Sequence, residues 1–420
     1  MQRYESYKSS GVEWLGEIPT HWDVRPGFTC FKENKDRNKG LVEKTVLSLS
    51  YGRIVIKPEE KLTGLVPESF ESYQLIKPGD IVIRTTDLQN DQTSLRVGYA
   101  KDKGMITSAY LGLRCHPEIN PAYVFRLLES YDALKVFYGM GSGLRQNIDF
   151  WDFKRLPVPL PPRDEQDRIV AFLDQKVAEV DAAIAKKERL IELLGEQREG
   201  LISRAVLIGL NEQVELRKSS VKWLKNIPKN WEELPCRYLF REVTRRDRDG
   251  SEQKLSVTQR NGLVPTDQMA EHSTQAQSFD EFKLCHVGDL VLNKYKAHLG
   301  VFWAAKVRGI ITNNYTVFRP TKKAFPPYFE LLFHTKWMCE QFSSVVYGVV
   351  DGMMPLYTKD FYSVQTVCPP LHEQQEIVSY CDEITRKIDS AIAQEERAIQ
   401  LLRELKTTLV ASYVMGKAQA

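Results

Sequence analysis

The chain has 420 residues, of which 42% are hydrophobic and 27% charged, and its formal net charge is +3. This composition is typical of a soluble globular protein with room for two or three domains. No apolar run reaches the roughly 18 residues that a membrane span needs, and the polar first residues contain no signal core. The seven scattered cysteines form no Cys-x-x-Cys pair. We therefore expect a cytoplasmic protein with neither a zinc site nor a disulfide framework.

The sequence contains one long internal repeat. Residues 14–22, two tryptophans around an Ile-Pro pair, return as residues 223–231. Residues 161–169, with the pattern Pro-Pro-x-x-Glu-Gln-x-x-Ile, return as residues 369–377. A period of about 208 residues is too long for a solenoid and indicates a duplicated module. Two similar modules predict a partner with two similar sites, and DNA is the first candidate.

Each copy shows the same succession of elements. A Gly-Asp turn before an apolar run predicts a strand entrance near residues 79–83 and 288–292. A short helix is expected near residues 121–136 and 326–343, and a proline-rich stretch then precedes one long helix. The predicted fold is α+β, with two pseudo-two-fold-related domains separated by two long helices. We expect the domains at residues 1–160 and 211–368, and the helices at residues 161–210 and 369–416.

The long helices have apolar residues at alternating spacings of three and four, which predicts a coiled coil. Asp164 offers a side-chain cap at the start of the first helix, while Gly209 and Gly416 are expected to end the two helices. The short connection after Gly209 favours an antiparallel pair. Lys187 and Glu395 interrupt the apolar seams at equivalent positions and would then face each other. Two ordinary amphipathic helices on a globular core are the alternative.

Motifs that would indicate catalysis are present only in part. Residues 137–143 look like the Phe-x-Gly-x-Gly loop that binds S-adenosylmethionine, but prolines follow where that site requires a helix. Residues 325–328, Phe-Pro-Pro-Tyr, lack the side-chain acceptor that an adenine methyltransferase places first. The histidines have no metal-ligand spacing, and the chain has no phosphate-binding Gly-Lys-Ser/Thr loop. We therefore expect no catalytic, cofactor or metal site in this chain.

The repeated Pro-Pro-x-x-Glu-Gln-x-x-Ile followed by a heptad helix resembles the specificity subunit of type I restriction-modification enzymes. The opening residues 14–22 and the strand at 79–84 are also similar to that family. The resemblance implies two target-recognition domains on an antiparallel coiled coil, and a subunit that performs no chemistry. It implies double-stranded DNA as a partner, together with two modification and two restriction subunits. Those partners would carry S-adenosylmethionine for adenine methylation, and ATP and magnesium for translocation and cleavage.

Base reading requires hydrogen-bonding side chains on loops that can enter a groove. Three loops in each copy meet this condition: one near residues 50–53 and 258–262, one after the Gly-Asp strand, and one at the glycine turn. An arginine run near residue 245 is expected to meet phosphates. The predicted DNA-binding residues are Tyr51, Arg53, Arg84, Thr85, Arg145, Gln146 and Asn147 in the first copy, and Arg245, Arg246, Gln259, Arg260, Asn261, Lys294, Tyr295, Lys296, Asp351 and Met353 in the second.

Because the two sets of loops differ, we expect a split, asymmetric DNA site whose halves lie about one helical turn, ~10 bp, apart. Two other functions fit part of the pattern. A coiled-coil protein that bridges DNA or scaffolds partners would show no sequence preference. A methyltransferase with degenerate motifs would bind S-adenosylmethionine itself.

Overall fold

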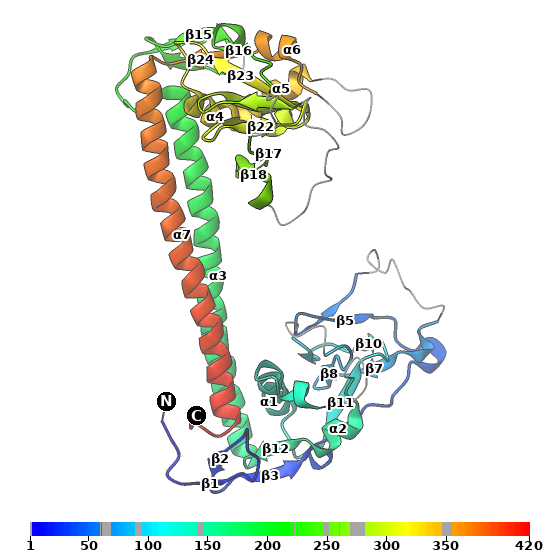
Figure 1. Ribbon diagram of the computed structural model, residues 1–420. Helices are drawn as coiled ribbons and strands as arrows, with labels where there is room; N and C mark the ends of the chain where they lie inside the picture. The colour runs from blue at the N-terminus through cyan, green and yellow to red at the C-terminus, as the bar shows by residue number, and fades with distance from the viewer. Residues whose placement is uncertain are drawn as a thin grey trace. The chain divides into compact units, whose positions relative to one another are not determined.

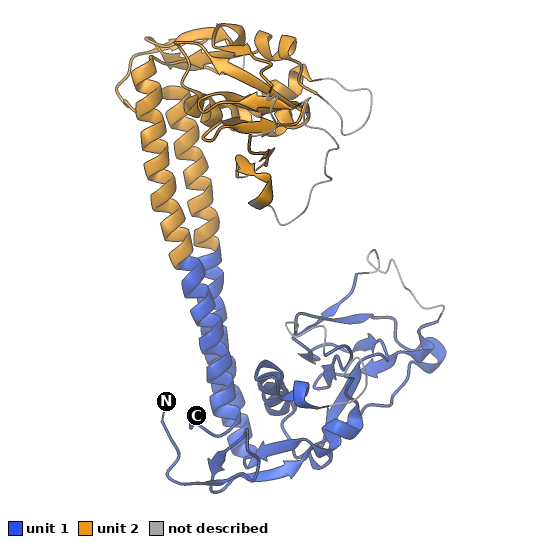
Figure 2. Cartoon of the chain, viewed as in Figure 1, with its two compact units in different colours: residues 1–188, 395–420 blue, residues 189–394 orange. Residues whose placement is uncertain are grey.

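The computed structural model describes residues 2–420 except 59, 61–68, 89–94, 141–146, 222–223, 247–251, 260, 269–281 and 347–354. The chain divides into two compact units (Figure 2). Unit 1 comprises residues 1–188 and 395–420, and unit 2 comprises residues 189–394. Each unit therefore contains one globular part and half of each long helix.

Unit 1 is built around a four-stranded antiparallel sheet with the order β4-β11-β8-β9 (Figure 1). The unit also contains the two-stranded pairs β1-β2, β3-β12, β5-β6 and β7-β10. Helix α1 contributes the buried face of an amphipathic helix to the core. The elements of the globular part are β1 Tyr7–Ser9, β2 Glu17–Pro19, β3 Asp23–Pro26, β4 Phe31–Glu33, β5 Leu47–Ser50, β6 Arg53–Ile56, β7 Gln74–Ile76, β8 Ile81–Ile83, β9 Val97–Tyr99, β10 Gly104–Ile106, β11 Leu111–Cys115, α1 Pro121–Ala133, α2 Phe150–Arg155 and β12 Pro157–Leu160.

Unit 2 repeats this topology with the sheet order β16-β23-β20-β21. The repeat read from the sequence is therefore a repeat of the fold, and the predicted α+β class is confirmed. The helix expected at residues 326–343 is two helices, because the first ends with His334 as its C-cap and Thr335 caps the second with its side chain. The elements are β13 Leu216–Lys218, β14 Asn226–Pro228, β15 Glu232–Pro235, β16 Phe240–Glu242, β17 Leu255–Val257, β18 Leu263–Pro265, β19 Lys283–Cys285, β20 Leu290–Asn293, β21 Phe302–Ala304, β22 Gly309–Ile311, β23 Tyr315–Pro320, α4 Pro326–Phe333, α5 Lys336–Val345, α6 Thr358–Ser363 and β24 Gln365–Cys368.

The long helices are α3, Arg163–Ile208, and α7, Leu371–Val414. Gly209 and Gly416 adopt φ angles of +89° and +72° just beyond the helix ends, as expected for glycines that end a helix. The predicted cap at Asp164 is wrong. The carbonyl of Pro162 accepts the first helical hydrogen bonds, so Asp164 lies inside the first turn of α3.

Ion pairs between the long helices run in opposite residue order, which makes them antiparallel. In unit 1, Lys187 Nζ lies 2.6 Å from Glu395 Oε2. Six residues earlier on α3, Asp181 pairs with Lys406, further along α7, at 2.7 Å. The two residues that interrupt the apolar seams therefore form an ion pair, as the sequence led us to expect.

The repeated tryptophans anchor the beginnings of the long helices. Trp22 in unit 1 is fully buried and donates its indole N–H to Glu165 in the first turn of α3, at 3.2 Å. Trp231 donates in the same way to Glu373 in the first turn of α7, at 2.8 Å. The repeat pattern of tryptophans also predicts a core position for Trp14, and this prediction is wrong because Trp14 is 42% exposed. Trp223 lies outside the described residues.

Two buried tyrosines hold the other ends of the long helices. Tyr123 of α1 lies with its hydroxyl 2.9 Å from the carbonyl oxygen of Val414, in the last turn of α7. Tyr328 of α4 donates its hydroxyl to the carbonyl of Val206, near the end of α3, at 2.7 Å. These carbonyls have no partner within a helix because the helices end there. Each unit thus clamps the start of one long helix and the end of the other.

Candidate nucleic-acid interface

The loop at residues 84–88 follows β8 in unit 1 and is fixed by the buried side chain of Arg96. The guanidinium donates to the carbonyl oxygens of Thr86 at 2.8 Å, of Asp87 at 3.1 Å and of Arg84 at 3.3 Å. The N–H of Arg84 in turn donates to the carbonyl of Arg96 at 2.9 Å. Thr85 is buried, whereas Thr86 is exposed and Arg84 half-buried. Solvent therefore reaches Thr86 most readily in this loop, and Arg84 and Asp87 to a lesser extent.

The segment after the glycine turn joins the same loop. Ile148 donates its N–H to the carbonyl of Thr85 at 3.0 Å, and the side-chain oxygen of Asn147 accepts from the N–H of Asp87 at 3.1 Å. Two of the three loops that the sequence selects in the first copy are therefore adjacent. Arg145 and Gln146 lie outside the described residues.

Unit 2 joins its corresponding loops at the equivalent positions. Leu356, which follows the second glycine turn, donates its N–H to the carbonyl of Lys294 at 2.8 Å. Here the loop is a 3-10 helix, Lys294–Leu299, whose first turn is capped by the side chain of Asn293. Lys296 is exposed, and the Nζ of Lys294 lies 5.5 Å from the centroid of the Tyr295 ring. Asp351 and Met353 lie outside the described residues.

The first predicted loop is the tip of a β-hairpin in each unit. Tyr51 and Gly52 connect β5 to β6 with φ angles of +47° and +74°, the signs of the type I′ turn that suits a tight hairpin. Tyr51 is 87% exposed at this tip, and Arg53 beside it is exposed as well. In unit 2, Gln259 and Asn261 are exposed between β17 and β18. Arg260 lies outside the described residues.

These hairpins pack against the start of β9 in unit 1 and against β21 in unit 2. A side-chain carbon added to Gly52 would come within 2.9 Å of Leu95, the neighbour of the loop-holding Arg96. In unit 2, Trp303 of β21 donates its indole N–H to the carbonyl of Thr258 at 2.9 Å. The hairpins are therefore held beside β9 and β21, the strands that pair with the central strands β8 and β20.

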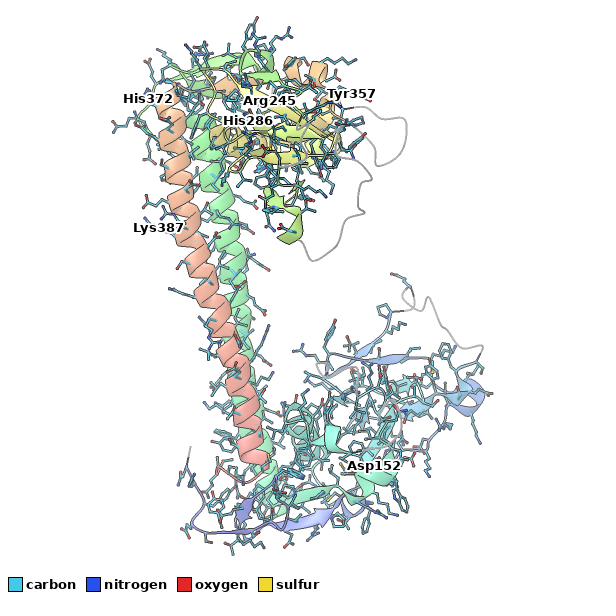
Figure 3. The ribbon with its side chains drawn as sticks, viewed as in Figure 1. Asp152, Arg245, His286, Tyr357, His372 and Lys387 are labelled. Carbon is cyan, nitrogen blue, oxygen red and sulfur yellow. The ribbon has the colours of Figure 1, made fainter. Side chains whose placement is uncertain are left out.

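Arg245 has a structural partner. Its guanidinium is paired with the buried carboxylate of Asp289 and contacts Nδ1 of His286 at 2.8 Å. Figure 3 labels Arg245 and His286 in unit 2. Burial, followed by the charge of Arg245, lowers the pKa of His286. The corresponding carboxylate in unit 1, Asp80, is held by Arg114 at 2.7 Å. The phosphate contact predicted for Arg245 stays a prediction, and it would have to be made by a cation already engaged in the fold.

The rest of the basic run differs from Arg245. Arg246 is exposed and forms a backbone bridge with Lys283. Burial lowers the pKa of Lys283, with the charge of Arg246 contributing in the same direction. Arg248 lies outside the described residues.

Sequence reasoning missed a basic aromatic patch on α2. Trp151 is 56% exposed, and its ring lies 4.3 Å from Nζ of Lys154 and 4.8 Å from Cζ of Arg155. The patch begins three residues after Ile148, which bonds to the loop after β8. The spacing Trp-x-x-Lys-Arg places the three side chains on one helical face, and this pattern could have been read from the sequence.

Within the described part of the chain, no three His, Cys, Asp or Glu residues come together in a way that could hold a metal ion. Among those same residues, no helix combines the length and the apolarity that crossing a bilayer requires.

Comparison with models of known protein families found no match. A protein described as the putative type I restriction enzyme MjaX specificity subunit of Methanocaldococcus jannaschii is 26% identical over 243 residues, which is 54% of this chain and 54% of that protein. The match thus spans about half the length of that relative. The type I restriction enzyme EcoKI specificity subunit of Escherichia coli K12 is 23% identical over 438 aligned residues, covering 96% of this chain and 91% of the relative.

Solved structures share the fold over nearly the whole chain. A chain from a study of complex assembly and conformational transition of the type I R-M system matches with a TM-score of 0.66 and 15% identity, covering 94% of this chain and 98% of that one. The crystal structure of the HsdS subunit from Thermoanaerobacter tengcongensis matches with a TM-score of 0.54 and 16% identity, covering 95% and 98% respectively.

Proposed function

We infer that this chain, a homologue of type I restriction enzyme specificity subunits with the fold of an HsdS subunit, recognises a specific DNA sequence. The observation that carries the proposal is the repeated frame around the loops. Thr85 is bonded to Ile148 in unit 1 as Lys294 is bonded to Leu356 in unit 2. The same backbone hydrogen bond thus joins two loops in each unit, while the side chains on those loops differ. This arrangement suits a DNA site made of two different halves.

The exposed side chains at the two hairpin tips favour different bases. Arginine pairs best with guanine, whereas asparagine and glutamine pair best with adenine. Unit 1 exposes Tyr51 and Arg53 at its hairpin tip, and unit 2 exposes Gln259 and Asn261 at the same place. We propose that unit 1 reads one half of the site and unit 2 the other.

We further propose that this chain performs no chemistry itself and acts in the cytoplasm. Two modification subunits would supply S-adenosylmethionine and methylate adenine, and two restriction subunits would supply ATP-driven translocation and magnesium-dependent cleavage. The role of the chain is then to bring these partners to one DNA sequence. A DNA-bridging or scaffolding protein without sequence preference is the alternative.

Methylome mapping tests the proposal. The full chain is expressed with its modification subunit in a host that lacks other adenine methylation, and methylated adenines are mapped genome-wide. We expect one bipartite, asymmetric motif. Arg84→Ala should relax base preference in one half, and Lys296→Ala should relax it in the other.

The size of these effects follows from the type of contact. Loss of a bidentate contact to a base costs about 1–3 kcal/mol of discrimination. A continuous or palindromic motif, or two variants that alter the same half, would overturn the two-unit assignment. Selection of binding sites from random duplexes that enriches no sequence would favour the bridging protein instead.

A further inference from the structure

We propose that Arg96 is a positioning residue for DNA recognition by unit 1, acting through the shape of the loop at residues 84–88. The inference rests on the proposed function and adds a specificity-determining residue that does not itself face the DNA. Arg96 is fully buried, and its guanidinium donates to three backbone carbonyls of a single loop. A buried charge requires polar partners, and here the loop backbone supplies them.

The loop conformation needs this support. Asp87 has a φ angle of +63°, a left-handed conformation that costs free energy for a residue with a side chain, although less for Asp than for most, so hydrogen bonds to its backbone favour it. Its carbonyl accepts from Arg96 at 3.1 Å, and its N–H donates to Asn147 at 3.1 Å. Arg96 therefore fixes one side of a turn whose other side is fixed by the third predicted loop.

Other contacts hold Arg96 itself in place. Its N–H donates to the buried carboxylate of Asp132 on α1 at 2.6 Å, and its Nε donates to the hydroxyl of Tyr138 at 3.3 Å. Arg96 directly precedes β9, which pairs with β8. Its contacts therefore fix the position of the loop relative to the central sheet and to α1. A loop held this way enters a DNA groove with little ordering cost on binding.

Unit 2 has a valine, Val301, at the position equivalent to Arg96. The backbone N–H of Asn293 donates to the carbonyl of Val301 at 3.0 Å, just as the backbone N–H of Arg84 donates to the carbonyl of Arg96 at 2.9 Å. Val301 is buried and has no side-chain donor, and the loop is instead a 3-10 helix capped by Asn293. The positioning role of Arg96 should therefore affect only the half of the site that unit 1 reads.

The test compares methylation motifs of the full chain expressed with its modification subunit. Arg96→Met removes all three donations to the loop and should raise methylation at sites with base changes in one half at least tenfold, leaving the other half unchanged. Arg96→Lys retains a donor and should lose less discrimination. Tyr138→Phe, which removes the contact to Nε and leaves the three donations to the loop in place, should give a change of about threefold in the same half.

Arg126→Met is the matched control, because Arg126 lies on α1 of the same unit and pairs with Glu129 and Asp174 away from the loop. It should lower the melting temperature without changing the motif. If Arg96→Met fails to fold, Arg96→Lys and Tyr138→Phe decide the matter. A lowered melting temperature with an unchanged motif in these variants would make Arg96 a structural residue and overturn the inference. The proposed function itself fails only if the unaltered chain yields no bipartite motif.

Discussion

The tyrosine clamps on the long helices give a quantitative prediction. Tyr123→Phe and Tyr328→Phe each remove one oxygen atom from a fully buried side chain and leave its packing intact. Val206 then loses the donor that lies 2.7 Å away, and Val414 loses the one at 2.9 Å. In unit 1 the hydroxyl also lies 2.7 Å from the carbonyl of Pro159, so a second acceptor is affected.

A buried carbonyl left without a donor costs about 1–3 kcal/mol. A local loss of about 2 kcal/mol corresponds to amide hydrogen exchange that is on the order of thirtyfold faster. We therefore expect Tyr123→Phe to accelerate exchange at residues 410–415 of α7, and Tyr328→Phe to accelerate it at residues 203–208 of α3. Exchange measured by mass spectrometry on the full chain resolves the two segments.

The two losses should be independent, because the tyrosines belong to different units and share no partner. The double variant should show both accelerations with nearly unchanged sizes. Tyr238→Phe is the control, since Tyr238 is 60% exposed and should have no effect beyond a few tenths of a kcal/mol. Unchanged exchange at residues 410–415 in Tyr123→Phe would refute the idea that this hydroxyl holds the end of α7.

Three further predictions follow from other contacts. Lys187→Glu should lower the stability of the helix pair by at most about 1 kcal/mol in urea unfolding, since the ion pair with Glu395 is partly exposed. Adding Glu395→Lys should restore part of the lost stability, and no recovery would contradict the pairing. Burial raises the pKa of Glu330 to about 7. The folded protein therefore loses stability as pH rises from about 4.5 to 7, because the unfolded chain gives up this proton at a lower pH than the folded chain does. Glu330→Gln should therefore be more stable than the unaltered chain by up to about 3 kcal/mol at pH 8 and equally stable at pH 4, and a difference independent of pH would argue against this ionisation. Lys154→Ala combined with Arg155→Ala should weaken binding to all DNA sequences alike and reduce the slope of log affinity against log salt by about 1–2, whereas an effect confined to one sequence would exclude phosphate contacts.

The long helices, their apolar seams and their ends could be predicted from the sequence, because these features depend on residues close together in the chain. The pairing of Lys187 with Glu395 follows from two helices of similar length and a seam that each residue interrupts once. Gly209 ends α3 as expected because a glycine adopts positive φ without strain. The start of α3 differs from the prediction. The carbonyl of Pro162 accepts the first helical hydrogen bonds, so α3 begins before the predicted cap at Asp164.

Contacts between distant segments could not be predicted in this way. The basic run around Arg245 suggested phosphate binding, but Asp289, 44 residues later, pairs with that side chain. Arg96 carried no signal because its role depends on how β8 and β9 bring it beneath a loop. Aligning the two copies would have shown an arginine where the second copy has Val301, which is the kind of difference that marks a residue particular to one unit.

Unit 1 is formed by two separate segments of the chain, and this affects the order of folding during synthesis. Unit 2 is one continuous stretch, residues 189–394, whereas unit 1 combines residues 1–188 with residues 395–420. Val410, Tyr413 and Val414 lie in the core of unit 1, so this core cannot close until the ribosome has made the whole of unit 2. Domains usually mature in the order in which they are made, and here that order is reversed. A premature stop near residue 394 would consequently disable the domain encoded first and spare the one encoded second.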